Sequence, residues 1–274
     1  MQRLPLLLMI AFTLVAGKIA RACAEQDGSP VRAIHAKSQQ EVADYSANYS
    51  LNGGAPQEQA AIAFAQKYPE SELRESLFAR AMQAYQRENS PDGILKMGER
   101  VLALDPNHSL ALVLTATVLA DSLVSGDPDR DKKVAEIKKN TARAIQTIDT
   151  NFVAPAAATP EQAGIYKTTL QAMAYSALGV TNLKTGDYTD AEKNLKMAAG
   201  LGKIHPDPYI WYHLALAQDH RRKYPAALNS VEQALQLASA NPDLQKLAET
   251  EHQRLTRLVG HGRESTDSGP QPPE

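Results

Sequence analysis

The residues best suited to chemistry lie near the carboxyl end, where two histidines and an aspartate could supply metal ligands. His213 and His220 are separated by two helical turns, and Asp219 lies between them. Seven residues of helix span about 10.5 Å, too far for two imidazoles to bind one zinc ion at about 2.1 Å. The other histidines have no ligand-type residue at a suitable spacing. We therefore expect no metal and no cofactor.

Catalytic motifs are absent from the sequence. It contains no glycine-rich phosphate loop, no His-Glu-x-x-His, no Gly-x-Ser-x-Gly and no Cys-x-x-Cys. We therefore expect a protein that is not an enzyme. The alternative is an enzyme with an unrecognised site, which would show a deep pocket holding two or more titratable groups.

Composition favours helices and argues against a nucleic-acid-binding protein. The 274 residues include 29 Lys and Arg against 31 Asp and Glu, a formal net charge of −2, whereas nucleic-acid binders usually carry a basic stripe. Hydrophobic residues make up 43% of the chain and aromatic residues only 5%. Stretches rich in Ala, Leu and Gln favour helix over strand. We expect an all-α chain with a buried core.

The first 24 residues have the order of a secretory signal peptide. Arg3 supplies a basic start, residues 4–16 form an apolar run, and small residues follow at positions 20, 22 and 24. The apolar run is too short to span a bilayer of about 30 Å. We therefore expect an exported protein of the periplasm or cell envelope.

Cys23 is the only cysteine in the sequence, and the position of cleavage decides its role. Cleavage before Glu25 leaves a mature chain without a thiol, so disulfides and thiolate catalysis become impossible. Cleavage before Cys23 places that residue at the amino terminus, where bacterial lipoproteins carry their lipid anchor. A membrane is a partner only in the second case, and the sequence leaves both alternatives open.

Two segments near the carboxyl end share one pattern of large and small residues. The earlier segment, the third copy along the chain, contains Tyr175, Leu178, Gly179, Tyr188, Ala191, Leu195 and Ala198. The later segment, the fourth copy, contains Trp211, Leu214, Ala215, Tyr224, Ala227, Val231 and Ala234. The pattern resembles the tetratricopeptide repeat, in which two antiparallel helices cross at a small residue. The resemblance places Gly179 and Ala215 at these crossings and implies a right-handed solenoid of helical hairpins.

Weaker copies precede these two, and capping residues followed by proline predict helix starts after Ser90, Asp127, Thr159, Asp207 and Asn241. We expect a polar, loosely attached arm over 25–55 with one helix at 38–49, and a first repeat block over 56–151 that opens with a helix at 57–67. An Ala/Pro linker over 152–159 then leads to a second block over 160–259. That block opens with a long helix at 161–184 and closes with a capping helix at 242–259. Residues 260–274 are expected to be disordered.

The resemblance implies a protein-interaction scaffold, because tetratricopeptide arrays bind a peptide or protein segment in a groove lined by the first helix of each pair. Mapped onto this chain, the groove residues are Arg80, Gln83, Arg87, Val113, Thr117, Ser176, Val180, Leu183, Tyr212, Leu216 and Asp219. Chaperone-binding members clamp a terminal carboxylate with Lys, Asn and Arg, but most of these positions here are apolar or small. We therefore do not expect that mode of recognition.

Two alternatives accompany this interpretation. The apolar groove residues could be covered by the amino-terminal arm or by the long helix of the third copy. The protein could also be a lipid-anchored outer-membrane assembly factor, since residues 68–72, Tyr-Pro-Glu-Ser-Glu, resemble a phrase common in lipoproteins of that kind.

Overall fold

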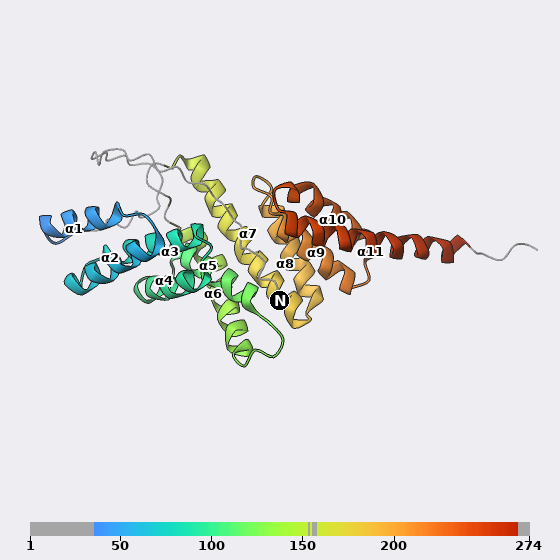
Figure 1. The fold of residues 1–274 in the computed structure, drawn as a ribbon, viewed down its shortest axis with the longest axis horizontal. Coiled ribbons are helices and arrows are strands. Elements are labelled where there is room, and N and C mark those ends of the chain that lie inside the picture. Colours follow the sequence, from blue (N-terminus) through green and yellow to red (C-terminus); the bar gives the residue numbers. More distant parts are fainter. Residues whose placement is uncertain (1–35, 153, 155–157, 268–274) are drawn as a thin grey trace, which may run out of the picture. The chain divides into compact units, whose positions relative to one another are not determined.

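The computed structural model describes residues 36–152, 154 and 158–267, and helices account for 81% of them. Within these ranges there is no β-strand, and helices pack against their neighbours in chain order (Figure 1). This confirms the all-α prediction. The predicted signal peptide and Cys23 lie outside the described residues.

The chain divides into two compact units, Met1–Ala111 and Leu112–Glu274. The division falls inside α5 (Ser109–Ser122), whereas the sequence placed the break between blocks at residues 152–159. The helices on either side of that Ala/Pro segment, α6 (Arg130–Asn151) and α7 (Pro160–Thr185), pack against each other within the second unit. The segment therefore joins two neighbouring helices of one unit.

The described part of the first unit contains α1 (Gln39–Tyr49), α2 (Gly54–Lys67), α3 (Arg74–Arg87) and α4 (Pro91–Leu104). The prediction of a loosely attached arm is wrong from α1 onward, because this helix packs against α2 and α3. The Tyr45 ring meets the Phe64 ring edge-on, with centroids 6.3 Å apart. Asp44 accepts hydrogen bonds from Lys67 Nζ at 2.5 Å and from the Tyr68 hydroxyl at 2.7 Å. One aromatic contact and one carboxylate thus attach a helix whose composition is mostly polar.

The Tyr85 ring of α3 lies between the first turns of α2 and α4. A Cβ atom added at Gly54 would lie 2.4 Å from this ring, and one added at Gly93 would lie 2.3 Å from it. The Tyr85 hydroxyl donates to Glu58 Oε2 of α2 at 2.6 Å. Burial and the Glu58 carboxylate raise the pKa of Tyr85 to about 12. Only glycine allows both helices to approach this ring so closely.

The described part of the second unit continues from α5 through α6 and α7 to α8 (Tyr188–Leu201), α9 (Pro208–His220), α10 (Tyr224–Leu237), the 3₁₀ turn η1 (Ala238–Ala240) and α11 (Pro242–Asp267). Thr159, Asp207 and Asn241 cap their helices as predicted, and Thr159 forms a capping box with Gln162. The prediction for Asp127 is wrong. That helix begins at Arg130, and the Asp127 side chain instead accepts from the Asp129 amide and pairs with Lys133.

Small residues lie where the helices of the second unit cross, as the repeat pattern predicted. A Cβ atom at Gly179 of α7 would lie 2.5 Å from Leu195 Cγ of α8. Ala215 of α9 is fully buried and shares a cluster with Val231 of α10. Leu195 and Ala215 belong to two separate apolar clusters, and Trp211 packs against both of them. This indole therefore links the α7–α8–α9 packing to the α9–α10–α11 packing.

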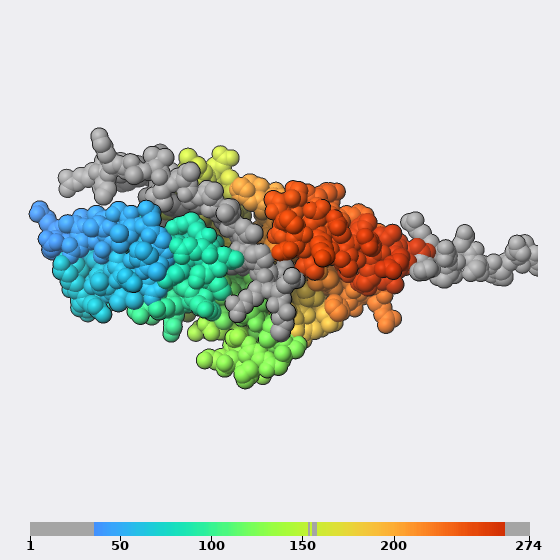
Figure 2. All heavy atoms as spheres, viewed as in Figure 1, coloured from blue at the N-terminus to red at the C-terminus, as the bar shows by residue number. Residues whose placement is uncertain are grey.

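The last helix, α11, covers α10 with Ala248 and Leu255, which join the cluster around Ala215. Figure 2 shows α10 and α11 as one continuous surface on this face of the second unit. The helix continues to Asp267 and so includes the first eight residues of the segment that the sequence predicts to be disordered. Gly260 does not end the helix, because a single glycine costs only about 1 kcal/mol relative to alanine.

We predict that Gly179→Ala lowers the free energy of unfolding by about 1 to 3 kcal/mol, because the new methyl group meets the Leu195 side chain and backbone. Gly164→Ala is the matched control on the same helix, since a Cβ atom there has no neighbour within 4 Å. The control should be unchanged or stabilised by up to about 1 kcal/mol. Urea unfolding of both variants tests this, and equal stabilities would contradict the crossing at Gly179.

Candidate functional site

Helix α9 carries half-buried side chains that its neighbours cover only in part. Its residues at positions 210, 214 and 217 join the cluster with α8, and Ala215 joins the cluster with α10 and α11. The half-buried residues that we call the α9 row are Tyr209, Tyr212, His213 and Leu216. The sequence predicted Tyr212 and Leu216 as groove residues, and the structure places them together in this row.

The α9 row offers aromatic and apolar contacts with little charge. The Tyr209 and Tyr212 rings lie 6.5 Å and 5.9 Å from the His213 ring, measured between centroids. Burial, with a smaller contribution from the charge of Lys184, lowers the pKa of His213 to about 4, so its imidazole is neutral at pH 7. Tyr209 Oη accepts a hydrogen bond from Asn241 Nδ2 at 2.8 Å, which orients its ring. Such a surface suits an apolar or aromatic ligand group.

Asp219 does not belong to an open surface. Its carboxylate pairs with Arg254 Nη2 of α11 at 2.6 Å, and the same guanidinium also bonds to Glu251 at 2.7 Å. The prediction of Asp219 as a groove residue is therefore corrected, because its side chain attaches the capping helix to α9. Helical spacing placed Asp219 one turn after Leu216, but spacing alone does not reveal a partner on a later helix.

The α7 residues of the predicted groove are mostly covered. Val180 is 4% exposed, and Leu183 packs against the apolar cluster formed by α8 and α9. The prediction for Val180 is corrected, because its side chain belongs to the core of the unit. Leu183 is half-buried, and its place in a groove stays a prediction. Ser176 is half-buried and leaves a small polar surface on α7.

The predicted groove residues of α5 differ from each other in exposure. Val113 is fully buried, so it cannot contact a partner and that prediction is corrected. Thr117 is half-buried, and its hydroxyl donates to the Val113 carbonyl at 2.9 Å. The apolar composition of α5 fits this burial, because a helix that is apolar on every side is usually enclosed.

The three predicted residues of the first copy all lie on α3, in the first unit. The Arg80 guanidinium lies over the Tyr49 ring of α1, 4.2 Å from its centroid. Gln83 is half-buried and Arg87 is exposed. Arg80 is therefore already engaged within the first unit by a cation–π contact with α1.

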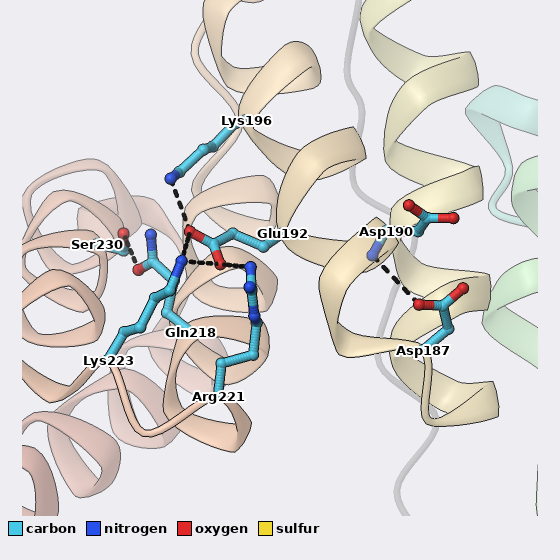
Figure 3. A network of polar contacts seen from close by, with 8 residues as sticks. All are labelled: Asp187, Asp190, Glu192, Lys196, Gln218, Arg221, Lys223 and Ser230. Atoms are coloured by element: carbon cyan, nitrogen blue, oxygen red, sulfur yellow. Dashed lines mark hydrogen bonds and ion pairs between the residues drawn. The ribbon is translucent and has the colours of Figure 1, made fainter.

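A buried carboxylate organises the polar contacts beside α9. Glu192 of α8 has a side chain that is 3% exposed, and it bonds to Lys196 at 2.7 Å, to Lys223 at 2.9 Å and to Arg221 (Figure 3). Burial alone would raise its pKa, but hydrogen bonds from Lys196 and Lys223 outweigh burial and hold the pKa at about 2. Three cations therefore share one carboxylate, and the turn between α9 and α10 is attached to α8.

A groove of about 460 Å³, which the sequence did not reveal, lies next to this network. We call it the α8–α10 groove. Its lining includes Lys196 and Gly200 of α8, Lys203 of the turn after α8, Trp211 and Leu214 of α9, and Ala226 of α10. Gln218 and Ser230 also face it, and the Ser230 hydroxyl donates to Gln218 Oε1 at 2.7 Å (Figure 3). The repeat pattern assigned the apolar members of this set to the core and therefore gave no signal for a groove.

No protein-family model and no curated protein sequence matches the chain. In the part of the chain that the structure describes, no cluster of three or more His, Cys, Asp or Glu side chains could hold a metal ion. Across the same residues, no helix is both long and apolar enough to cross a membrane. The candidate site must therefore be interpreted from its own geometry.

We predict that Glu192→Gln lowers the free energy of unfolding at pH 7 by about 1 to 3 kcal/mol, because charge-assisted hydrogen bonds to a buried acceptor are lost. The native pKa of Glu192 is about 2 against an ordinary 4.5, so its stabilisation is present above pH 4.5 and disappears as the pH falls through 2. The stability gap between variant and wild type should therefore close between these values. Denaturant unfolding from pH 7 to pH 2 measures the gap.

Glu232→Gln is the control for this experiment. The Glu232 side chain is 46% exposed and faces His252 at 3.5 Å, so its loss should change stability by less than about 1 kcal/mol. A constant gap between wild type and Glu192→Gln across the whole pH range would contradict the role of Glu192.

Proposed function

We propose that the protein is a non-catalytic scaffold of tetratricopeptide-like helical hairpins, exported to the periplasm or cell envelope, that binds a segment of another protein on the α9 row. The observation that carries this proposal is the exposure left on α9 after α8, α10 and α11 have packed against it. Tyr209, Tyr212 and Leu216 stay half-buried, whereas core residues of the same helix are at most 5% exposed.

The arrangement of the last four hairpin helices supports the repeat interpretation. Gly179 meets Leu195 where α7 crosses α8, and Ala215 shares a cluster with Val231 where α9 packs on α10. The two helix pairs thus use a small residue and an apolar partner at equivalent positions. In such repeats the first helix of each pair lines the binding face.

The chemistry of the α9 row defines the kind of partner. A helical or extended segment with an apolar side could cover Tyr212 and Leu216, and rigid tyrosine rings provide contact area at a low entropic cost. The basic residues of α3 do not strengthen this proposal, because Arg80 is already engaged by Tyr49. We therefore propose apolar contact, without a required charge, as the basis of recognition.

We predict that Tyr212→Ala weakens binding of the main partner by about 2 kcal/mol or more, roughly thirtyfold, because truncating a central aromatic removes the largest contact. The experiment captures partners from the envelope fraction with wild-type protein, then measures affinity for the captured partner by calorimetry. Tyr212 also packs against the cluster of α10 and α11, so each variant is measured well below its own melting temperature.

Two further variants keep this test decisive. Leu216→Glu places a charge in the α9 row and should weaken binding to a similar degree, whereas Gln236→Glu changes an exposed position of α10 and should have no effect. Binding that survives both α9 substitutions would exclude the row. Loss of binding on deleting residues 25–35 alone would then assign recognition to the segment before α1. A deletion through residue 55 is unsuitable, since α1 packs on Phe64.

We predict that mass spectrometry of the mature protein finds Glu25 at the amino terminus, because small residues at positions 22 and 24 precede it. A diacylglycerol-modified Cys23 would instead support the second candidate function, a lipid-anchored outer-membrane assembly factor, for which the Tyr-Pro-Glu-Ser-Glu phrase at residues 68–72 is the specific observation. An intact Met1 would contradict export.

A further inference from the structure

We propose that the α8–α10 groove is a second recognition site, which takes one large apolar side chain of a partner protein together with a carboxylate next to it. This site is separate from the α9 row, because its lining consists of other residues, among them Trp211 and Leu214 of α9 and the two lysines Lys196 and Lys203. The proposal does not depend on the α9 row being a binding face.

The shape of the groove fits an inserted apolar group. Trp211 is half-buried and lines a volume of about 460 Å³, and Leu214, which is 2% exposed, lies beneath it at the same lining. The neighbouring lining residues Ala199, Gly200 and Ala226 have short side chains and leave this volume unfilled. A Cβ atom added at Gly200 would have no neighbour within 4 Å. A ligand group can therefore reach the indole without displacing the helices.

The charge around the groove favours an anionic ligand. Lys196 and Lys203 both line it, and Lys196 shares Glu192 with Lys223 and Arg221. One carboxylate, that of Glu192, thus faces three cations. In the described part of the chain, Lys203 forms no ion pair. Asp187 and Asp190 lie at the start of α8, apart from the three cations (Figure 3). The excess of positive charge is therefore available to a carboxylate from outside.

The surface beside the lysines points to a protein segment as the occupant. Met197 is 46% exposed and Ile204 is 60% exposed, and each directly follows one of the two groove lysines in the sequence. These apolar side chains next to the lysines offer a polypeptide additional contacts outside the groove. A small carboxylate anion is too short to reach them. The groove is open to solvent and not enclosed, so a segment can insert one side chain while the rest of the segment stays outside.

The single tryptophan of the chain makes this site directly observable, since Trp211 is the only indole and it lies in the groove. The probe is a short acetylated, amidated peptide without aromatic residues, in which one leucine is flanked by two glutamates. Titration should produce a saturable blue shift of the Trp211 emission as the leucine covers the indole. The matched peptide with two glutamines should bind about tenfold more weakly.

Variants of the protein test the geometry and the charge separately. Gly200→Phe fills the groove and should abolish binding, whereas Gly164→Phe on α7, where a Cβ atom also meets nothing, should leave it unchanged. Lys203→Glu should weaken binding of the glutamate peptide by about fivefold, and Lys246→Glu, an exposed change on α11, should not. Peptide binding to these variants is measured by calorimetry, because Gly200→Phe also changes the surroundings of Trp211.

Three results would overturn the proposal. The first is the absence of a saturable shift with the glutamate peptide, and the second is equal affinity for the glutamate and glutamine peptides. The third is a shift produced by dodecanoate but not by the peptide, which would assign the groove to a fatty acid.

Binding of the glutamate peptide to Tyr212→Ala with unchanged affinity would confirm that the groove acts independently of the α9 row.

Discussion

Close approach of helices at residues with little or no side chain is the constraint on which the rest of the structure depends. Leu195 packs directly against Gly179 at the α7–α8 crossing, and the Tyr85 ring packs directly against Gly54 and Gly93 in the first unit. Because protein interiors are close-packed, a methyl group at such a point must displace its neighbour. The crossings fix which side of each helix is buried, and the α9 row and the α8–α10 groove are made of residues left over by this packing.

The buried Glu192 carboxylate adds an electrostatic connection to this packing. It holds Lys196 of α8 and two cations of the α9–α10 turn, so the ends of three helices share one anchor. Desolvating a carboxylate is costly, and the cost is offset only because several charged donors surround it. The same arrangement leaves positive charge beside the α8–α10 groove. One buried group therefore contributes to both stability and the character of the adjacent surface.

Local signals in the sequence predicted the helices well, whereas contacts between distant residues stayed hidden. Thr159 and Asp207 mark helix starts through their own capping bonds, which depend only on the next few residues. Asp219 and Val113 are predicted as groove residues because the resemblance to the tetratricopeptide repeat assigns them to the first helix of a pair. In the structure, the Asp219 carboxylate pairs with Arg254, and Val113 is fully buried. The same reasoning missed Glu192, since a glutamate on a helix normally signals a solvated surface.

The Tyr85 ring has a consequence for how the first unit opens. Since Gly54 and Gly93 both press on this ring, α2 and α4 cannot separate from α3 one at a time without leaving the aromatic ring exposed and the Glu58 hydrogen bond broken or strained. Local unfolding in proteins follows such cooperative groups rather than single helices. The three helices should therefore exchange their most protected amide hydrogens in one shared opening event, so that this stretch behaves as a single unit in the native-state dynamics.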